Sequence, residues 1–204
     1  MKSILISIKP EFVEKILNGE KTIEIRKTKP SCELPCKVYI YETKSKYKKG
    51  FYNNLDHKVH YCEYFGKGNV VAEFTLNKVS TYDWDTDFLN TKQNMYYIKS
   101  GEVDKTCLTY EQMCDYGKGK DLYGWYIDNL KIFERPKELS EFYKNNYKKI
   151  IDDLEFNGCD EKHCKYAIGN SFIGDDGYCD YSGCPKLRLQ IPPQSWCYVE
   201  ELEV

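Results

Sequence analysis

A six-residue segment of the chain combines side chains that could bind or act on a polar ligand: Lys21, Thr22, Glu24 and Arg26. Polar and apolar residues alternate there, which predicts a half-buried β-strand. Because side chains alternate across a strand, Thr22, Glu24 and Arg26 should project from the face opposite the two isoleucines. Lys21 stands where this strand begins. The segment therefore predicts a row of polar groups on one strand face.

The residue types in this row suit an anionic or hydrogen-bonding ligand. Arg26 offers a planar fork that matches a phosphate or a carboxylate. Glu24 could hold Arg26 by an ion pair or accept a hydrogen bond from a base amino group. Lys21 could contact a phosphate or donate a proton. The simpler interpretation is an exposed cross-strand salt bridge, typically worth under about 1 kcal/mol, and residue types alone leave both open.

Further candidates for ligand binding stand at the two ends of the chain. Lys9 follows the first predicted strand and could contact a phosphate. Gln194 and Ser195 precede the last predicted strand, and the first and last strands of a barrel are often neighbours. Trp196 could stack on a base or lie buried in the core. These side chains could therefore reach the same cleft as the polar row.

Two pairs of cysteines share one spacing in a Gly- and Asp-rich segment: Cys159 with Cys164, and Cys179 with Cys184. Four thiolates bind zinc tetrahedrally, and the segment has few apolar residues to bury, so a metal would account for its folding. Such a zinc ion would be structural, because four protein ligands leave no open position. Free thiols, a disulfide, an iron–sulfur cluster, or replacement of one cysteine by His163 are the alternatives.

The elements that would position these residues follow from periodicity and from cap and turn residues. Pro10 should begin a helix that Asn18-Gly19 ends, and Thr109 should cap a second helix that Gly117 ends. A third helix is predicted over residues 136–147. Strands are predicted over residues 3–9, 21–26, 38–41, 69–78 and 123–133, the last with a bend near Asp128-Asn129, and after the Pro192-Pro193 turn.

Short strands interleaved with short helices predict an α+β fold, a small β-barrel with flanking helices. The length of 204 residues suits one domain over residues 1–204. Segment 44–66 should be a polar, Tyr-rich loop or hairpin insertion. Segment 155–190 should be a Cys-rich insertion that could bind zinc.

Charge is unevenly distributed along the chain. Residues 1–50 carry 12 Lys and Arg against 6 Asp and Glu, so the rest must carry −8 to give the net charge of −2. A basic segment on an acidic body is the electrostatic footprint of a protein that binds phosphates, although solvated surface lysines give the same count. The 19 tyrosines could stack on bases or reflect only coding bias.

The sequence also bears on compartment and assembly. It contains no apolar run near the roughly 20 residues of a membrane span, and its first eight residues are too short for a secretory signal. We therefore expect a cytoplasmic protein, and a monomer because no exposed apolar stripe is evident. In a reducing compartment, ten cysteines favour metal binding or burial over disulfides.

The order of several short motifs resembles the ASCH family (activating signal cointegrator homology), a branch of the PUA-like superfamily. The family pattern Gly-x-Lys-x-x-Glu-x-Arg is matched by Gly19, Lys21, Glu24 and Arg26. Residues 123–127, 136–140 and 192–199 also look like segments of small ASCH proteins, which are frequent in bacterial and prophage genomes. The resemblance covers most of the chain and weakens over 44–66 and 155–190.

This resemblance implies a PUA-like barrel with a basic cleft beside the first helix, where RNA or a nucleotide would bind. Some relatives resemble an amidohydrolase of acetylated cytidine nucleosides, and others have ribonuclease activity, so the fold does not choose the function. The amidohydrolase pattern has Thr two positions before Arg26, where this chain has Glu24. Hydrolysis here would need a water activated by Glu24.

Three functions therefore stay open. The first is an RNA- or nucleotide-binding module that uses Lys9, Lys21, Glu24, Arg26, Gln194 and Ser195. The second is a hydrolase of a modified nucleoside or of RNA, with Lys21, Thr22 and Glu24 as its catalytic residues. The third is a protein-interaction module in a mobile-element setting. Whether the protein is an enzyme is not decided by these residues.

Overall fold

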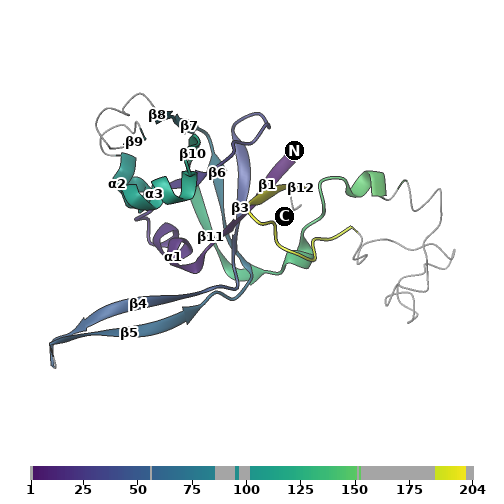
Figure 1. The fold of residues 1–204 in the computed structure, drawn as a ribbon. Coiled ribbons are helices and arrows are strands. Elements are labelled where there is room, and N and C mark those ends of the chain that lie inside the picture. The colour runs from purple at the N-terminus through teal and green to yellow at the C-terminus, as the bar shows by residue number, and fades with distance from the viewer. Residues whose placement is uncertain are drawn as a thin grey trace, which may run out of the picture.

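The computed structural model describes residues 2–55, 57–85, 95–96, 102–150, 152 and 187–200. Within these ranges β-strands predominate and the helices are short (Figure 1). The helices are α1 (Pro10–Leu17), α2 (Glu102–Thr106), α3 (Tyr110–Gly117) and the 3₁₀ helix η2 (Leu139–Glu141), and residues 147–150 are also helical. The strands are β1 (Lys2–Ile8), β2 (Ile23–Arg26), β3 (Cys36–Glu42), β4 (Lys46–Asn53), β5 (Lys58–Phe65), β6 (Val70–Leu76), β7 (Val79–Tyr82), β8 (Trp84–Asp85), β9 (Met95–Tyr96), β10 (Leu122–Tyr126), β11 (Asp128–Lys137) and β12 (Trp196–Glu200).

A five-stranded mixed sheet with the order β11-β6-β3-β1-β12 forms the largest layer. β1 pairs parallel with β3 and antiparallel with β12, so the two ends of the described chain lie side by side. Residues 3–8 of β1 are all buried, because both faces of this sheet are covered. The predicted pairing of first and last strands is confirmed.

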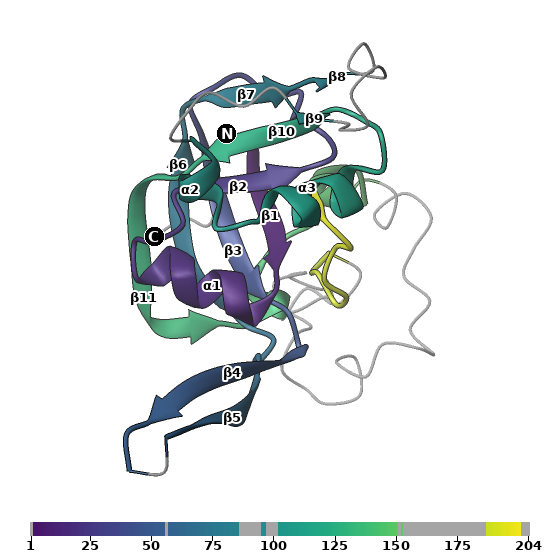
Figure 2. The ribbon, with the colours of Figure 1, turned by 60° about the vertical axis from the view of Figure 1, so that its left-hand side comes forward.

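Helix α1 covers one face of the large sheet, as Figure 2 shows. Pro10 occupies the first turn, and Val13 and Ile16 pack against the apolar residues of β1, β3 and β6. The helix ends at Leu17 with Asn18 as its C-cap, and Gly19 follows with a φ of 76°, a conformation that glycine adopts without steric cost. The predicted helix and its stop are both confirmed.

A second sheet with the order β2-β10-β7 carries the polar row. In the antiparallel register of β2 and β10, Arg26 lies opposite Tyr123 and Glu24 lies opposite Trp125. One face of this sheet packs against Met113 of α3 through a cluster that includes Ile23. The other face adjoins the large sheet through Trp125, so both faces of β2 are buried.

β4 and β5 form a long antiparallel hairpin that projects from the rest of the molecule (Figures 1 and 2). Eight residue pairs join the two strands, from Lys46 with Phe65 to Asn53 with Lys58. Segment 44–66 is therefore a hairpin, one of the two forms that the sequence predicts. Every residue of β5 is exposed.

The predicted closed barrel is wrong for the described strands, although the α+β class is confirmed. β11 and β12 form the two edges of the large sheet, and β2, β10 and β7 form a sheet of their own. The predicted strand over 123–133 is divided between the sheets: β10 ends at Tyr126 and β11 begins at Asp128. Asn129 in β11 adopts a left-handed φ of 49°, at the position where the sequence predicts a bend. Side-chain packing around Trp125 joins the sheets instead of a continuous ladder.

The predicted helix over 136–147 is also wrong. β11 continues through Pro136 to Lys137, which pairs with Val70; Pro136 is tolerated because β11 is an edge strand. After the short η2, Tyr143 forms a bridge with Arg188. These partners lie far away in sequence, so local periodicity gave no indication of them.

Three further comparisons with the sequence concern smaller parts of the chain. The helix capped by Thr109 is present and ends at Gly117 as predicted, and Lys118 caps it with a left-handed φ of 52°. The four cysteines predicted to bind zinc lie outside the described residues. None of the helices within the described ranges is long and apolar enough to cross a bilayer.

Thr109 allows a test of how α3 is held. Its side chain accepts a hydrogen bond from the backbone of Gln112, and the Gln112 side chain accepts one from the backbone of Thr109. We expect Thr109→Ala to lower the free energy of unfolding by about 1 kcal/mol in urea denaturation, because the capping box loses one of these bonds. Thr109→Ser keeps the hydroxyl and should cost little. Equal losses for both variants would show that the cap does not contribute.

Candidate functional site

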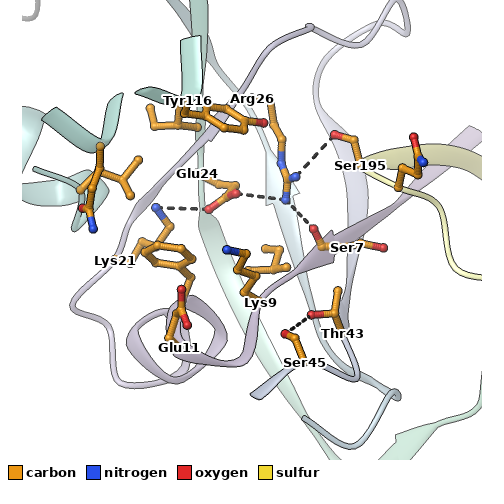
Figure 3. A pocket seen from close by; sticks show the side chains of 16 residues that line it. Ser7, Lys9, Glu11, Lys21, Glu24, Arg26, Thr43, Ser45, Tyr116 and Ser195 are labelled. Atoms are coloured by element: carbon orange, nitrogen blue, oxygen red, sulfur yellow. Dashed lines mark hydrogen bonds and ion pairs between the residues drawn. The ribbon is translucent and has the colours of Figure 1, made fainter. Parts of the chain in front are cut away.

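A pocket of about 520 Å³ lies where α1, β2, α3 and the turn before β12 meet. All six residues predicted to contact a ligand line it: Lys9, Lys21, Glu24, Arg26, Gln194 and Ser195. They come from segments up to 186 positions apart in sequence. Figure 3 shows these segments converging, with Glu24 between Lys21 and Arg26.

The centre of the pocket wall is a buried ionic network of Lys21, Glu24 and Arg26, which we call the charge triad. Lys21 Nζ lies 3.2 Å from Glu24 Oε2, and Arg26 Nη2 lies 3.0 Å from Glu24 Oε1. Lys21 is 1% exposed, and Glu24 and Arg26 are each 7% exposed. The exposed salt bridge considered from the sequence is therefore the wrong description. Both faces of β2 are covered, so the polar row is buried.

The ammonium group of Lys21 has all of its hydrogen-bond acceptors within the protein. Besides Glu24, Nζ donates to the backbone carbonyls of Ile23 at 2.9 Å and Thr106 at 2.5 Å. It also lies 5.2 Å from the centre of the Phe12 ring. An ammonium group has three donors, and all three have an acceptor here. Lys21 therefore orients and neutralises Glu24, and it has no spare donor for a ligand.

Arg26 is the member of the triad with remaining hydrogen-bonding capacity. Nη2 donates to the backbone carbonyl of Ser7 at 2.8 Å, and Nη1 makes a long contact of 3.4 Å with Ser195 Oγ. Nε is buried and has no hydrogen-bond partner among the described residues. The buried Nε is not accessible to a ligand, but Nη1, with its long contact to Ser195 at the pocket wall, is suited to donate to a polar ligand atom.

Ser7 holds the turn that carries Gln194 and Ser195. Its backbone N–H donates to the Ser195 carbonyl at 2.8 Å, and its hydroxyl donates to the Pro193 carbonyl at 2.7 Å. These bonds continue the β1–β12 ladder past the start of β12 and fix the turn against the pocket. The sequence analysis missed Ser7, because it lies in an apolar strand and its role depends on a partner near the other end of the chain.

Tyr116 is a second pocket residue that the sequence analysis missed. It comes from α3, and its hydroxyl points toward Arg26 (Figure 3). Burial raises the pKa of the Tyr116 hydroxyl, and the adjacent Arg26 guanidinium partly offsets that effect. The phenol therefore stays protonated at neutral pH and can donate a hydrogen bond. The sequence predicts the helix that carries Tyr116, but the periodicity of nearby residues does not predict that this helix packs against the sheet of β2.

Thr22, the remaining predicted catalytic residue, does not line the pocket. Its backbone N–H donates to the Lys105 carbonyl at 3.0 Å, and its carbonyl accepts from Ile127 at 2.9 Å. β2 begins only at Ile23, so Thr22 precedes the strand instead of forming its first member. The structure thus brings Lys21 and Glu24 together and leaves the Thr22 hydroxyl outside the pocket.

The part of the chain that the structure describes gathers no metal-binding side chains near this pocket. Across the described ranges there is no group of three or more His, Cys, Asp or Glu residues placed to hold a metal ion. Two of the described thiols, those of Cys32 and Cys36, are neighbours, and their Sγ atoms lie 3.4 Å apart. Burial, and then the neighbouring Cys32 thiol, raise the pKa of Cys36 to about 12. Cys36 is therefore a protonated, poorly reactive thiol at neutral pH.

Replacing Lys21 tests the burial of the charge triad. Lys21→Met removes one of the two cations that neutralise Glu24 and should lower the free energy of unfolding by about 3–5 kcal/mol in urea denaturation. Lys9→Met, at an exposed position in the same pocket, should change it by less than about 0.5 kcal/mol. Similar small effects for both variants would contradict a buried triad.

The Cys36 environment predicts slow alkylation. A pKa of about 12 instead of the ordinary 9.0 lowers the thiolate fraction at pH 8 by about a thousandfold. Peptide mapping after a short iodoacetamide treatment should find exposed Cys62 modified and Cys36 unmodified. Modification of both at the same rate in the folded protein would contradict the described burial.

Comparison with known proteins identifies similar solved structures. No protein-family model matches the sequence, and no curated protein matches it. The crystal structure of ASCH from Zymomonas mobilis aligns with a TM-score of 0.44 at 20% identity, over 74% of this chain and 80% of that chain. Two single-residue variants of that protein align similarly, each at 20% identity. The Tyr-to-Phe variant has a TM-score of 0.44, and its alignment covers 75% of this chain and 84% of that chain. The Ser-to-Ala variant has a TM-score of 0.43, and its alignment covers 72% of this chain and 78% of that chain.

Proposed function

We propose that this protein binds RNA or a nucleotide and that the pocket beside α1 holds one nucleotide unit. The observation that carries the proposal is the charge triad in the pocket wall, with an Arg26 guanidinium that is incompletely satisfied. A buried ionic network is expensive to desolvate and adds little net stability. Its position at a pocket therefore favours a role in ligand recognition over a role in folding.

The charges of the pocket suit a ligand that has both an anionic and a polar uncharged part. Three cationic side chains line it, Lys9, Lys21 and Arg26, against the carboxylates of Glu11 and Glu24. Lys9 is exposed at the N-terminus of α1, where the helix dipole also attracts an anion. A phosphate would be bound near Lys9 and Arg26, whereas the exposed Gln194 amide could exchange hydrogen bonds with a base edge.

Size and apolar surface also support a nucleotide. A volume of about 520 Å³ falls within the usual range for small-ligand pockets, about 300–1,000 Å³. Phe12 and Tyr116 both line the pocket, and aromatic rings stack on any base. The protonated Tyr116 hydroxyl could in addition donate to a phosphate or a carbonyl.

Two features favour binding over the hydrolytic alternative. The Lys21 ammonium is saturated with acceptors, and the two Glu24 oxygens are each held by a cation, so neither group is free to shuttle a proton. The Thr22 hydroxyl lies outside the pocket and cannot attack a ligand there. Binding needs none of these groups to change its partners.

The test is a fluorescence-anisotropy titration of wild-type and Arg26→Lys protein with a labelled 12-nucleotide single-stranded RNA at 50 mM and 200 mM salt. Arg26→Lys keeps a cation beside Glu24 and removes the planar fork, so affinity should fall about tenfold or more while the fold persists. Wild-type binding should weaken steeply with salt, because phosphate contacts release counterions.

The control is Arg135→Lys, the same substitution at an exposed position of β11 outside the pocket. It should bind RNA as wild type does. Circular dichroism melts would establish that each variant is folded. Folded wild-type protein that binds neither this RNA nor ribonucleoside monophosphates would overturn the proposal, as would an Arg26→Lys variant with unchanged affinity.

A further inference from the structure

The β4–β5 hairpin exposes several aromatic and basic side chains that do not contribute to a packed core. It projects from the body of the protein, and its large apolar side chains have no cover among the described residues (Figure 1). Tyr61 is 68% exposed and Phe65 is 67% exposed. A two-stranded ribbon without a packed face is marginally stable alone, so these residues are not there to form a core.

Strand register sorts the hairpin residues into two faces. Directly paired residues share a face, and successive pairs alternate. One face carries the stacked rings of Tyr47 and Tyr64, and at its base Tyr47 and Lys49 both bond to Glu14 of α1. This inner face is therefore tied to the body. The opposite, outer face consists of Lys46, Lys48, Tyr52, Val59, Tyr61 and Phe65, together with Glu63 and Gly50.

The outer face combines rings with cations. The side chains of Tyr61 and Val59 lie close to Gly50, where a Cβ atom would meet each of them at 3.1 Å, so both side chains pack against the glycine. Lys46 and Lys48 are 66% and 67% exposed, and they share one carboxylate, Glu63, at 4.0 and 3.7 Å. Such exposed contacts hold a lysine weakly, so both ammonium groups remain available to an anion.

Charge favours a nucleic acid as the partner of this face. Residues 44–67 contain six lysines and two carboxylates, a net charge of +4 on a chain whose total is −2. Basic side chains interleaved with exposed rings are the surface that binds single-stranded nucleic acid through phosphate contacts and base stacking. An apolar protein partner would instead desolvate two lysines that share a single carboxylate, Glu63.

The hairpin begins at the pocket. Thr43 and Ser45, whose hydroxyls lie 2.8 Å apart, line the pocket wall immediately before β4 (Figure 3). The bonds from Tyr47 and Lys49 to Glu14 fix the base of the ribbon against the same helix that borders the pocket. A chain that leaves the pocket beside Ser45 would therefore meet the hairpin next.

We propose that the outer face of the β4–β5 hairpin binds the single-stranded RNA that extends beyond the nucleotide held in the pocket. This inference rests on the proposed function and adds to it that the ligand is a chain, with Lys46 and Lys48 contacting phosphates and Tyr61 and Phe65 stacking on bases. The hairpin then supplies affinity that grows with RNA length, whereas the pocket binds one unit regardless of length.

The experiment compares a labelled dinucleotide with a labelled 12-nucleotide single-stranded RNA of mixed sequence. Lys46→Gln/Lys48→Gln should weaken binding of the 12-nucleotide RNA about tenfold at 50 mM salt and reduce its log–log salt slope by about 1.4, or about 0.7 for each lost phosphate contact. Tyr61→Ser/Phe65→Ser should weaken it at least about fivefold through lost stacking. Both variants should bind the dinucleotide as wild type does.

The matched control is Lys148→Gln/Lys149→Gln, which removes the same charge from two exposed lysines outside the hairpin and should leave both affinities unchanged. Unchanged 12-nucleotide affinity in both hairpin variants would overturn the inference while Arg26→Lys still tests the pocket. Loss in the hairpin variants with none in Arg26→Lys would instead support the hairpin and overturn the pocket function. A folded wild-type protein that binds neither RNA would overturn the inference, and one that also fails to bind ribonucleoside monophosphates would overturn the proposed function.

Discussion

The buried ion pairs of Glu24 with Lys21 and Arg26 are the constraint that organises the structure around the pocket. A carboxylate that is 7% exposed can stay ionised only if cations and hydrogen bonds replace its water. The cations in turn require acceptors, which the backbone carbonyls of Ser7, Ile23 and Thr106 provide. The triad thus couples β1, β2 and α2, and a change in any of these elements would leave a buried charge without a partner.

The pocket and the hairpin present two different physical solutions to binding a polar ligand. The pocket is preorganised: Ser7 fixes the turn with Ser195, the capping box of Thr109 holds α3, and Tyr116 is placed beside Arg26. The hairpin instead offers an open surface with weakly held charges, which suits contacts that do not depend on the position of single atoms. Together they would combine a site for one nucleotide with length-dependent affinity.

Local sequence predicted several elements correctly, because their determinants lie within one turn or one strand. Pro10 and Gly19 bound α1, Thr109 caps α3, and the alternation over β2 gives a strand. The failures share one cause, which is pairing with distant segments. Pro136 suggested a helix start, yet the ladder with β6 keeps its strand extended, and the strand predicted over 123–133 breaks at Ile127 into strands of two sheets. Closure into a barrel likewise depends on which edges pair, and sequence periodicity carries no such information.

The sequence by itself determined which residue types are available at the site. Glu24 and Arg26 are two positions apart, so they lie on one side of a strand. The identity of each side chain, including Lys21, fixes its charge and its hydrogen-bond donors. Only the tertiary structure decided that the row is buried, because α1 and the large sheet cover the face that periodicity marked as solvent-exposed. It also decided the roles of the two cations: every donor of the Lys21 ammonium has an acceptor within the protein, whereas Arg26 makes only a long contact with Ser195 at the pocket wall. Burial and donor satisfaction depend on neighbours that the chain brings from 19 to 169 positions away, and such distances are settled only when the whole core packs.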